Sequence, residues 1–186
     1  MGEGYAKIKR GGMDMIETKD LILRKASFED WRPMYENVWS REETAKFMFW
    51  DVTRSEEDAR SRMERTIAFQ KVTPFGLTVI EKATGNAIGF AGMKEIEPGV
   101  FEDIGVALGP EFVGKGYGKQ ILSAFVEELF NRQGAKKIIC SCRSQNEASR
   151  QLQLSCGFTF SHTEEKVDPR NGEPYVLEFY ELKKRK

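Results

Sequence analysis

The chain reads Val113-Gly114-Lys115-Gly116-Tyr117-Gly118-Lys119 where an apolar, strand-like segment (104–108) gives way to an amphipathic, helix-like one (121–130). Three glycines in alternate positions at such a turn leave main-chain N–H groups uncovered and let a ligand approach the backbone closely. The N-terminus of a helix also carries partial positive charge, and Lys115 and Lys119 add two cationic side chains. The stretch therefore predicts a site for a phosphate or a diphosphate.

Two well-known phosphate loops fit this stretch poorly. A dinucleotide fingerprint needs Gly-x-Gly-x-x-Gly and an acidic residue about 20 positions later, whereas the segment after this helix offers only Lys136 and Lys137. The segment from Gly109 to Lys115 fits the first seven positions of a nucleotide-hydrolase P-loop, but Gly116 replaces the hydroxyl residue that holds magnesium. A small nucleotide hydrolase therefore remains an alternative with an incomplete metal site.

A third comparison fits better and extends beyond one loop. Residues 113–122 resemble the diphosphate loop of the GNAT (Gcn5-related) N-acetyltransferases, Gln/Arg-x-x-Gly-x-Gly/Ala, although Val113 replaces the usual Gln or Arg. Asn146-Glu147-Ala148-Ser149, followed by Cys156-Gly157-Phe158, resembles the second signature of that family. The segments 21–24 (Leu-Ile-Leu-Arg) and 88–92 (Ile-Gly-Phe-Ala-Gly) are similar to the subgroup that acts on ribosomal-protein N-termini. In order, the matches run from about residue 21 to the end.

Composition describes an ordinary soluble protein of 186 residues, with 40% hydrophobic and 31% charged residues. The 29 basic and 29 acidic side chains cancel, so no general field attracts nucleic acid or an anionic membrane. We expect a cytoplasmic protein, because no apolar run approaches the ~20 residues of a membrane span and no signal-peptide core is visible. Three cysteines and one histidine have no metal-ligand spacing, so no metal is expected. We expect a flexible leader over 1–17 and a single acetyltransferase domain over 18–186.

Hydrophobic periodicity and turn residues predict an α/β (α+β) chain with the order β-α-α-β-β-β-α-β-α-β-β. A strand–helix–strand crossover around each signature helix requires a parallel step in an otherwise mostly antiparallel sheet. This order agrees with the GNAT fold that the resemblance implies. The expected strands cover 21–25, 75–81, 87–97, 101–108, 136–142, 158–163 and 175–182, and the expected helices cover 28–39, 56–70, 117–133 and 146–155.

The resemblance implies acetyl-CoA as cosubstrate and assigns residues to it. Main-chain N–H groups over Val113, Gly114, Lys115, Gly116, Tyr117, Gly118 and Lys119 would bind the diphosphate. The main chain of Val106, Ala107 and Leu108 would pair with the pantetheine arm. Asn146 and Ser149 would lie near that arm or the adenine, and Asn146 is also a good N-cap for the helix that it precedes.

Acetyl transfer to an amine also needs a base, for which Glu102 and Asp103 are the candidates. Because side chains alternate along a strand, at most one of the two points into a given cleft, and a water relay remains open as well. A backbone N–H within 106–108 is the natural oxyanion donor. The family's usual tyrosine is replaced by Gln153, so Cys156, Tyr180 or solvent is left to protonate the thiolate.

The amine acceptor is not defined by the sequence. The aromatic residues Trp31, Trp39, Phe47, Phe49 and Trp50 are interpreted mainly as core. Residues 54–65 alternate arginines with acids, a pattern typical of an exposed helix face with internal ion pairs. A protein N-terminus or a small amine is the expected partner, and a homodimer is left open. A non-catalytic module that binds acyl-CoA is the alternative function.

Overall fold

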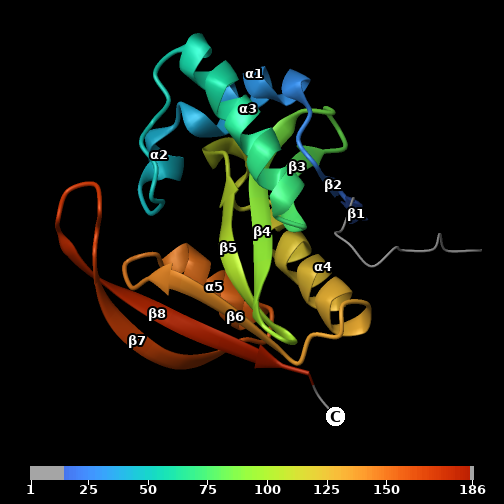
Figure 1. The fold of residues 1–186 in the computed structure, drawn as a ribbon, viewed down its shortest axis with the longest axis vertical. Coiled ribbons are helices and arrows are strands. Elements are labelled where there is room, and N and C mark those ends of the chain that lie inside the picture. Colours follow the sequence, from blue (N-terminus) through green and yellow to red (C-terminus); the bar gives the residue numbers. More distant parts are fainter. Residues whose placement is uncertain (1–14, 185–186) are drawn as a thin grey trace, which may run out of the picture.

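The computed structural model describes residues 15–184, which form one eight-stranded sheet with helices packed against it (Figure 1). The strands are β1 (Met15–Glu17), β2 (Leu21–Arg24), β3 (Phe75–Glu81), β4 (Ala87–Glu97), β5 (Val100–Leu108), β6 (Lys137–Arg143), β7 (Thr159–Val167) and β8 (Pro174–Lys183). The α-helices are α1 (Trp31–Met34), α2 (Glu42–Ala45), α3 (Glu56–Val72), α4 (Tyr117–Asn131) and α5 (Glu147–Ser155). Two 3₁₀ turns cover Phe28–Asp30 and Pro110–Phe112, and a π-helical turn covers Tyr35–Trp39.

The strand order in the sheet is β1-β2-β3-β4-β5-β6-β8-β7. All neighbouring strands pair antiparallel except β5 and β6, which pair parallel and are joined by the crossover through α4. The mixed, mostly antiparallel sheet that the sequence predicts is therefore confirmed.

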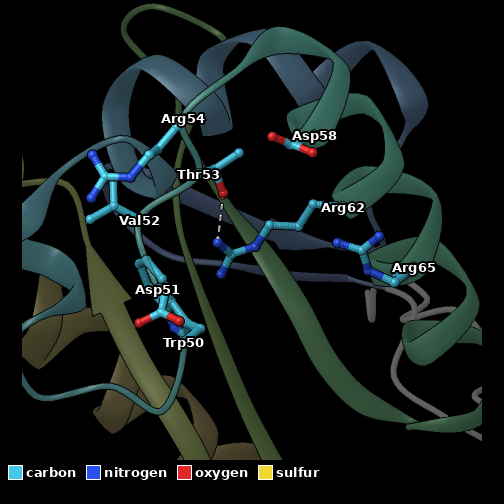
Figure 2. A pocket seen from close by; sticks show the side chains of 8 residues that line it. All are labelled: Trp50, Asp51, Val52, Thr53, Arg54, Asp58, Arg62 and Arg65. Carbon is cyan, nitrogen blue, oxygen red and sulfur yellow. Dashed lines mark hydrogen bonds between the residues drawn. The ribbon is translucent and has the colours of Figure 1, made fainter. Parts of the chain in front are cut away.

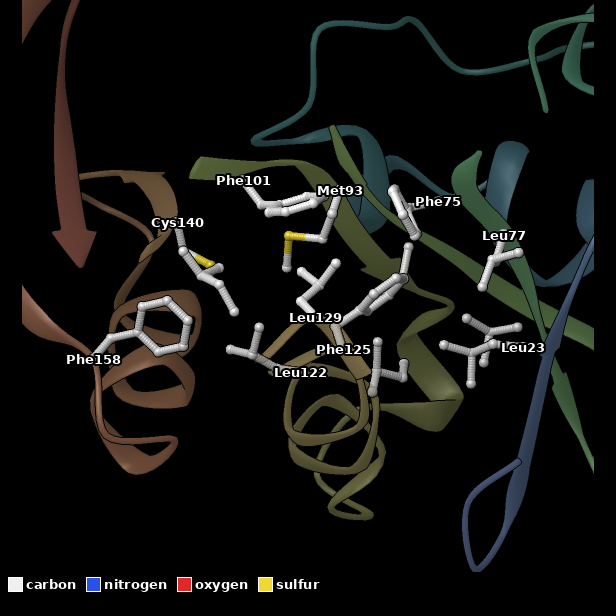
Figure 3. Packing of buried hydrophobic residues seen from close by; sticks show 14 of the residues in the cluster. Leu23, Phe75, Leu77, Met93, Phe101, Leu122, Phe125, Leu129, Cys140 and Phe158 are labelled. Carbon is white, nitrogen blue, oxygen red and sulfur yellow. The ribbon is translucent and has the colours of Figure 1, made fainter. Parts of the chain in front are cut away.

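Two hydrophobic clusters hold the helices on the sheet. In the larger one, Ile121, Leu122, Phe125 and Leu129 form the buried face of α4 and are at most 2% exposed. They pack against sheet residues such as Leu23, Phe75 and Phe101 (Figure 3). The spacing of these α4 residues follows the helical period, which is why the sequence predicts this element well.

The smaller cluster joins α1, the π-helical turn and α3 to the strands β3 and β4. It contains Met34, Val38, Trp39, Ala59, Met63, Ile80 and Ala87. α3 begins at the predicted cap, where Ser55 Oγ accepts the N–H of Asp58 at 3.1 Å. The central strand β3 is buried along its whole length.

The structure differs from the sequence-based expectations at the N-terminal side. Met15–Glu17 form β1 and pair with β2, so this part of the predicted leader is wrong, and residues 1–14 lie outside the described residues. The expected helix over 28–39 is three consecutive segments, and its last turn is π-helical, with Ser40 N–H bonded to Tyr35 C=O at 3.0 Å. The extra residue in that turn lets both Val38 and Trp39 enter the core. Within 15–184, none of the helices combines the length and the apolar character that crossing a membrane requires.

Candidate active site

A cleft opens in the middle of the sheet because β5 and β6 separate. Their parallel pairing covers only three residue pairs, of which Glu102 with Ile139 is the last. Beyond it, β5 follows β4 as far as Leu108, while β6 follows β8 as far as Arg143. The two halves of the sheet consequently run at an angle to each other (Figure 1). A cavity of about 610 Å³ lies between them.

A bulge in β5 accompanies this separation. Gly92 of β4 pairs with Gly105, and Met93 pairs with Asp103, so Ile104 has no partner on β4. Gly105 has φ +118°, a conformation that side-chain-bearing residues rarely adopt. A bulge bends its strand, and this one accompanies the departure of β5 from β6. Because pairing with β6 stops at Glu102, the edge of β5 that faces away from β4 has no strand partner over 103–108 in the described sheet.

The glycine-rich turn closes one end of the cleft. Gly114 (φ +82°) and Gly116 (φ +79°) both require glycine, and a Cβ atom at either position would meet no atom within 4 Å. The space beside this backbone is therefore open. Gly116 is also the N-cap of α4, whose first N–H groups have no acceptor within the helix. Uncovered donors at a helix N-terminus beside open space suit a phosphate group.

The side chains of the turn divide between two directions. Gly118 and Lys119 line the cleft together with Val113, Gly114 and Gly116. Lys115 and Tyr117 do not line it, because both are turned toward the buried Glu81. The Tyr117 hydroxyl donates to Glu81 Oε1 at 2.8 Å, and Lys115 Nζ lies 3.7 Å from the same atom. Of the two predicted lysines, only Lys119 lines the cleft.

The two acidic residues of β5 point to opposite sides, as strand alternation predicts. Asp103 lines the cleft and accepts the main-chain N–H of Ser141, on β6, at 2.9 Å. Burial raises the pKa of Asp103 to about 7, although the hydrogen bond from Ser141 opposes the shift. Glu102 is outside the cleft lining, and its carboxylate lies 3.4 Å from Lys94 Nζ on β4. Only Asp103 combines access to the cleft with a pKa suited to take up a proton near neutrality.

The second sequence signature forms the opposite wall. Asn146 caps α5 by accepting the N–H of Ser149 at 3.2 Å, and both residues line the cleft. Ser149 Oγ accepts a hydrogen bond from Gln153 Nε2 at 3.2 Å, and Gln153 Nε2 also donates to Ser141 C=O at 3.3 Å. Gln153 is 3% exposed, and its Oε1 atom has no hydrogen-bond partner among the described residues. The wall thus presents amide and hydroxyl groups rather than a tyrosine hydroxyl.

The geometry agrees with comparisons to known proteins. A family model described as an acetyltransferase (GNAT) domain matches residues 20–159 of the 186. The chain belongs to the GNAT acetyltransferase family. The Bacillus subtilis (strain 168) protein named as the uncharacterized N-acetyltransferase YoaA is 25% identical over 172 residues, which cover 91% of this chain and 97% of that protein.

Solved GNAT structures share the architecture. An acetyltransferase of the GNAT family from Bacillus anthracis superposes with a TM-score of 0.78 at 22% identity, covering 91% of this chain and 98% of that one. RimL, described as a ribosomal alpha-N-protein acetyltransferase in complex with coenzyme A, gives a TM-score of 0.75 at 20% identity over 91% of this chain and 97% of that one. At these identities the two likenesses establish a common fold.

Cys140 and Cys142 of this GNAT chain do not supply a reactive thiolate. Cys140 and Cys142 line the cleft, but burial raises the pKa of both thiols, that of Cys142 to about 11. They are therefore protonated near neutral pH. Cys156, which sequence reasoning kept as a possible acid, is outside the cleft lining, and its Sγ lies 3.8 Å from Ser123 Oγ.

Sequence reasoning interpreted Phe47 and Phe49 mainly as core and missed Met48 and Arg143. All four line the far end of the cleft, the first three from the loop after α2 and Arg143 from β6. The Arg143 guanidinium lies 4.2 Å from the Tyr175 ring centroid and 5.3 Å from that of Phe49. Phe49 is 56% exposed, whereas Trp39 is buried as predicted. The aromatic-rich composition of 31–50 was the available signal, but it does not tell the core residues from the cleft residues.

Arg143 is fixed by the buried Asp168, which precedes the turn between β7 and β8. Arg143 Nη2 donates to Asp168 Oδ2 at 2.7 Å, and Arg170 Nη2 donates to the same atom at 2.8 Å. These two guanidinium groups hold the pKa of Asp168 well below its ordinary value. Of these two arginines, Arg143 lines the cleft and Arg170 does not.

Proposed function

We propose that this chain is an acetyl-CoA-dependent N-acetyltransferase that acts on a primary amine by direct transfer in a ternary complex. Membership of the GNAT family supports acetyltransferase chemistry in general. The single observation that carries the specific proposal is Asp103, a carboxyl group with a pKa of about 7 inside the cleft that begins at the glycine-rich turn. Acetyl-CoA would supply the acetyl thioester, and the chain would supply the binding groups and the base.

Binding would rest mainly on main-chain donors. N–H groups over 114–119 suit the diphosphate, and Lys119 adds the positive charge that faces the cleft. The unpaired edge of β5 over Val106, Ala107 and Leu108 suits the amide groups of the pantetheine arm, which would pair with it as a strand does. Asn146 and Ser149 would flank the arm from the α5 side.

Asp103 would act as the general base. It would take a proton from the bound ammonium group and leave a neutral amine that attacks the thioester carbonyl. A main-chain N–H on the free edge of β5 would donate to the carbonyl oxygen as negative charge develops there. Gln153 cannot donate a proton at neutral pH, and a thiolate is a weak base, so it would leave and take its proton from solvent. Glu102 has no part in this scheme, because its carboxylate is beside Lys94.

The test is an acetyl-CoA-dependent screen over peptides with free N-termini and small amines. Thiol release gives the rate, and mass spectrometry identifies the acetylated product. We expect Asp103→Asn to lower kcat/KM by about 10²–10⁴-fold, the usual contribution of a positioned base. Glu102→Gln is the matched control, since it removes the same charge one residue away, and we expect a change below about threefold. Equal losses in the two variants would refute the assignment of the base.

A second function is favoured by one observation, the glutamine at position 153. A chain without an acid for the leaving group suits a module that binds acyl-CoA and does not turn it over. In that case acetyl-CoA would raise the melting temperature, while no amine in the screen would be acetylated. The same thermal-shift assay with ATP and magnesium tests the nucleotide-hydrolase alternative, for which we expect no stabilisation.

A further inference from the structure

A second cavity, of about 550 Å³, lies between the first half of α3 and the loop 50–54 that leads into it (Figure 2). Its lining contains three arginines and two aspartates, so its formal charge is positive. Arg62 and Arg65 reach into it from α3, whereas Arg54 points away from Arg62 (Figure 2). None of its lining residues belongs to the cleft described above.

Arg62 is a held cation without a counter-ion. Its guanidinium lies 4.2 Å from the ring centroid of Trp50 and 4.9 Å from that of Trp39. The one hydrogen bond that the guanidinium makes within residues 15–184 runs from Nη1 to Thr53 Oγ1, at 2.9 Å. No acidic side chain of that range forms an ion pair with Arg62, contrary to the internal ion pairs that the sequence pattern predicts.

The surroundings of Arg62 oppose its charge. Burial, with a smaller contribution from the neighbouring Arg65, lowers the pKa of Arg62 to about 10. The two acids of the lining do not compensate for this. The Asp58 carboxylate accepts the Ser55 hydroxyl at 2.7 Å, and Asp51 is exposed at the rim. The Arg62 guanidinium is already partly removed from water and has no counter-ion. An anion that binds there therefore adds little to the desolvation of the guanidinium.

Arg62 lines the cavity and offers it hydrogen-bond donors. Arg62 has five N–H donors, arranged as a planar fork that matches carboxylate and phosphate oxygens. The fork is held between two tryptophan rings, so little side-chain entropy remains to be lost on binding.

We propose that this cavity binds a small molecule through an oxyanion, a carboxylate or a phosphate, that Arg62 takes by its fork and Arg65 attracts by its charge. The cavity is larger than a single phosphate group, so the oxyanion is one part of its occupant. This proposal does not depend on the acetyltransferase activity, because it concerns a separate site with its own binding assay.

The loop that borders the cavity also borders the cleft. Residues 47–49 line the far end of the cleft, and residues 50–54 line the cavity. The loop is anchored from two sides: Thr53 N–H donates to Trp39 C=O at 2.8 Å, and Arg170 Nη1 donates to Trp50 C=O at 3.4 Å. An occupant that binds Arg62 would therefore contact the same loop that lines the far end of the cleft.

The experiment is a calorimetric titration of inorganic phosphate, at ionic strength kept constant with chloride, into four proteins. They are the wild type, Arg62→Lys, Arg65→Gln and the control Lys71→Gln, which removes an exposed cation near the end of α3 outside the cavity. Arg62→Lys keeps the charge between the tryptophans but loses the fork, so it does not depend on removing a packed side chain. Phosphate that binds at the glycine-rich turn contributes equally to all four proteins.

We expect phosphate to bind the wild type and Lys71→Gln equally and to bind each arginine variant about tenfold more weakly, the loss of one charge-assisted contact. The same phosphate affinity in all four proteins, or no binding to the wild type, would overturn the proposal. Acetylation assays with added phosphate then identify which molecule carries the oxyanion. If phosphate competes with an acceptor amine that carries a carboxylate or phosphate, the cavity binds the acceptor. If phosphate changes the KM for an acceptor without such a group, the cavity binds a separate ligand.

Discussion

Replacing Asp103 by asparagine should make the protein more stable at alkaline pH while it removes activity. The pKa of Asp103 in the folded chain is about 7, against an ordinary value of 3.8. Between these two values the folded state holds a proton that the unfolded chain releases, so the stability of the wild type falls as pH rises through this window. Asparagine stays neutral throughout, and its side-chain oxygen still accepts the Ser141 N–H.

The magnitude follows from the two pKa values. Each pH unit well between them is worth about 1.4 kcal/mol of unfolding free energy. From pH 5 to pH 7 the wild type therefore loses about 2 kcal/mol relative to the variant, since the folded carboxyl is already half ionised at pH 7. Above about pH 8 both states of the wild type are ionised at this position, and the difference stays constant. Other titrating groups are common to both proteins and cancel in the comparison.

Urea unfolding at pH 5.0, 7.0 and 8.5, at one ionic strength, measures this difference. Glu102→Gln serves as the control, because it keeps the Asp103 carboxyl and removes only the smaller contribution of Glu102 to its pKa. It should retain most of the wild-type loss. A difference between wild type and Asp103→Asn that varies by less than about 0.5 kcal/mol over this range would refute a partly buried, proton-accepting Asp103.

Three further outcomes follow from the cleft. Gly114→Ala should raise the Kd for acetyl-CoA in a calorimetric titration and lower the unfolding free energy by about 1 kcal/mol, because alanine is strained at φ +82°. Lys119→Gln should weaken acetyl-CoA binding about threefold to tenfold, whereas Lys115→Gln, whose charge faces Glu81, should change it by less than twofold; equal effects would contradict the two orientations. Gln153→Leu should lower the melting temperature, because it removes the hydrogen bonds from Gln153 Nε2 to Ser149 Oγ and Ser141 C=O, and an unchanged melting temperature would contradict these two bonds.

The local features of the fold were predictable because local signals determine them. The α4 face has a helical period, Ser55 and Asn146 are good caps, and glycines mark the turns, so most elements begin and end within a few residues of the expected positions. The glycine-rich turn and the opposite directions of Glu102 and Asp103 follow from the same kind of rule.

The rest depends on contacts between distant segments. The bulge at Ile104 and the separation of β5 from β6 arise from register with two different partner strands, which the sequence of β5 does not encode alone. The same reason explains why Phe49 and Arg143, 94 residues apart, could not be placed together at one end of the cleft. The sequence pattern of α3 predicted ion pairs for its arginines, but Arg62 faces tryptophans that come from other segments.

The central claim is that uncovered main-chain groups of one turn and one strand edge hold a thioester carrier beside Asp103. A crystal structure of the protein with acetyl-CoA tests it most directly. The account predicts the diphosphate within hydrogen-bond distance of N–H groups in 114–119, the pantetheine amides paired with 106–108, and the thioester between β5 and β6. Acetyl-CoA bound away from this turn, or with its thioester outside that gap, would contradict it.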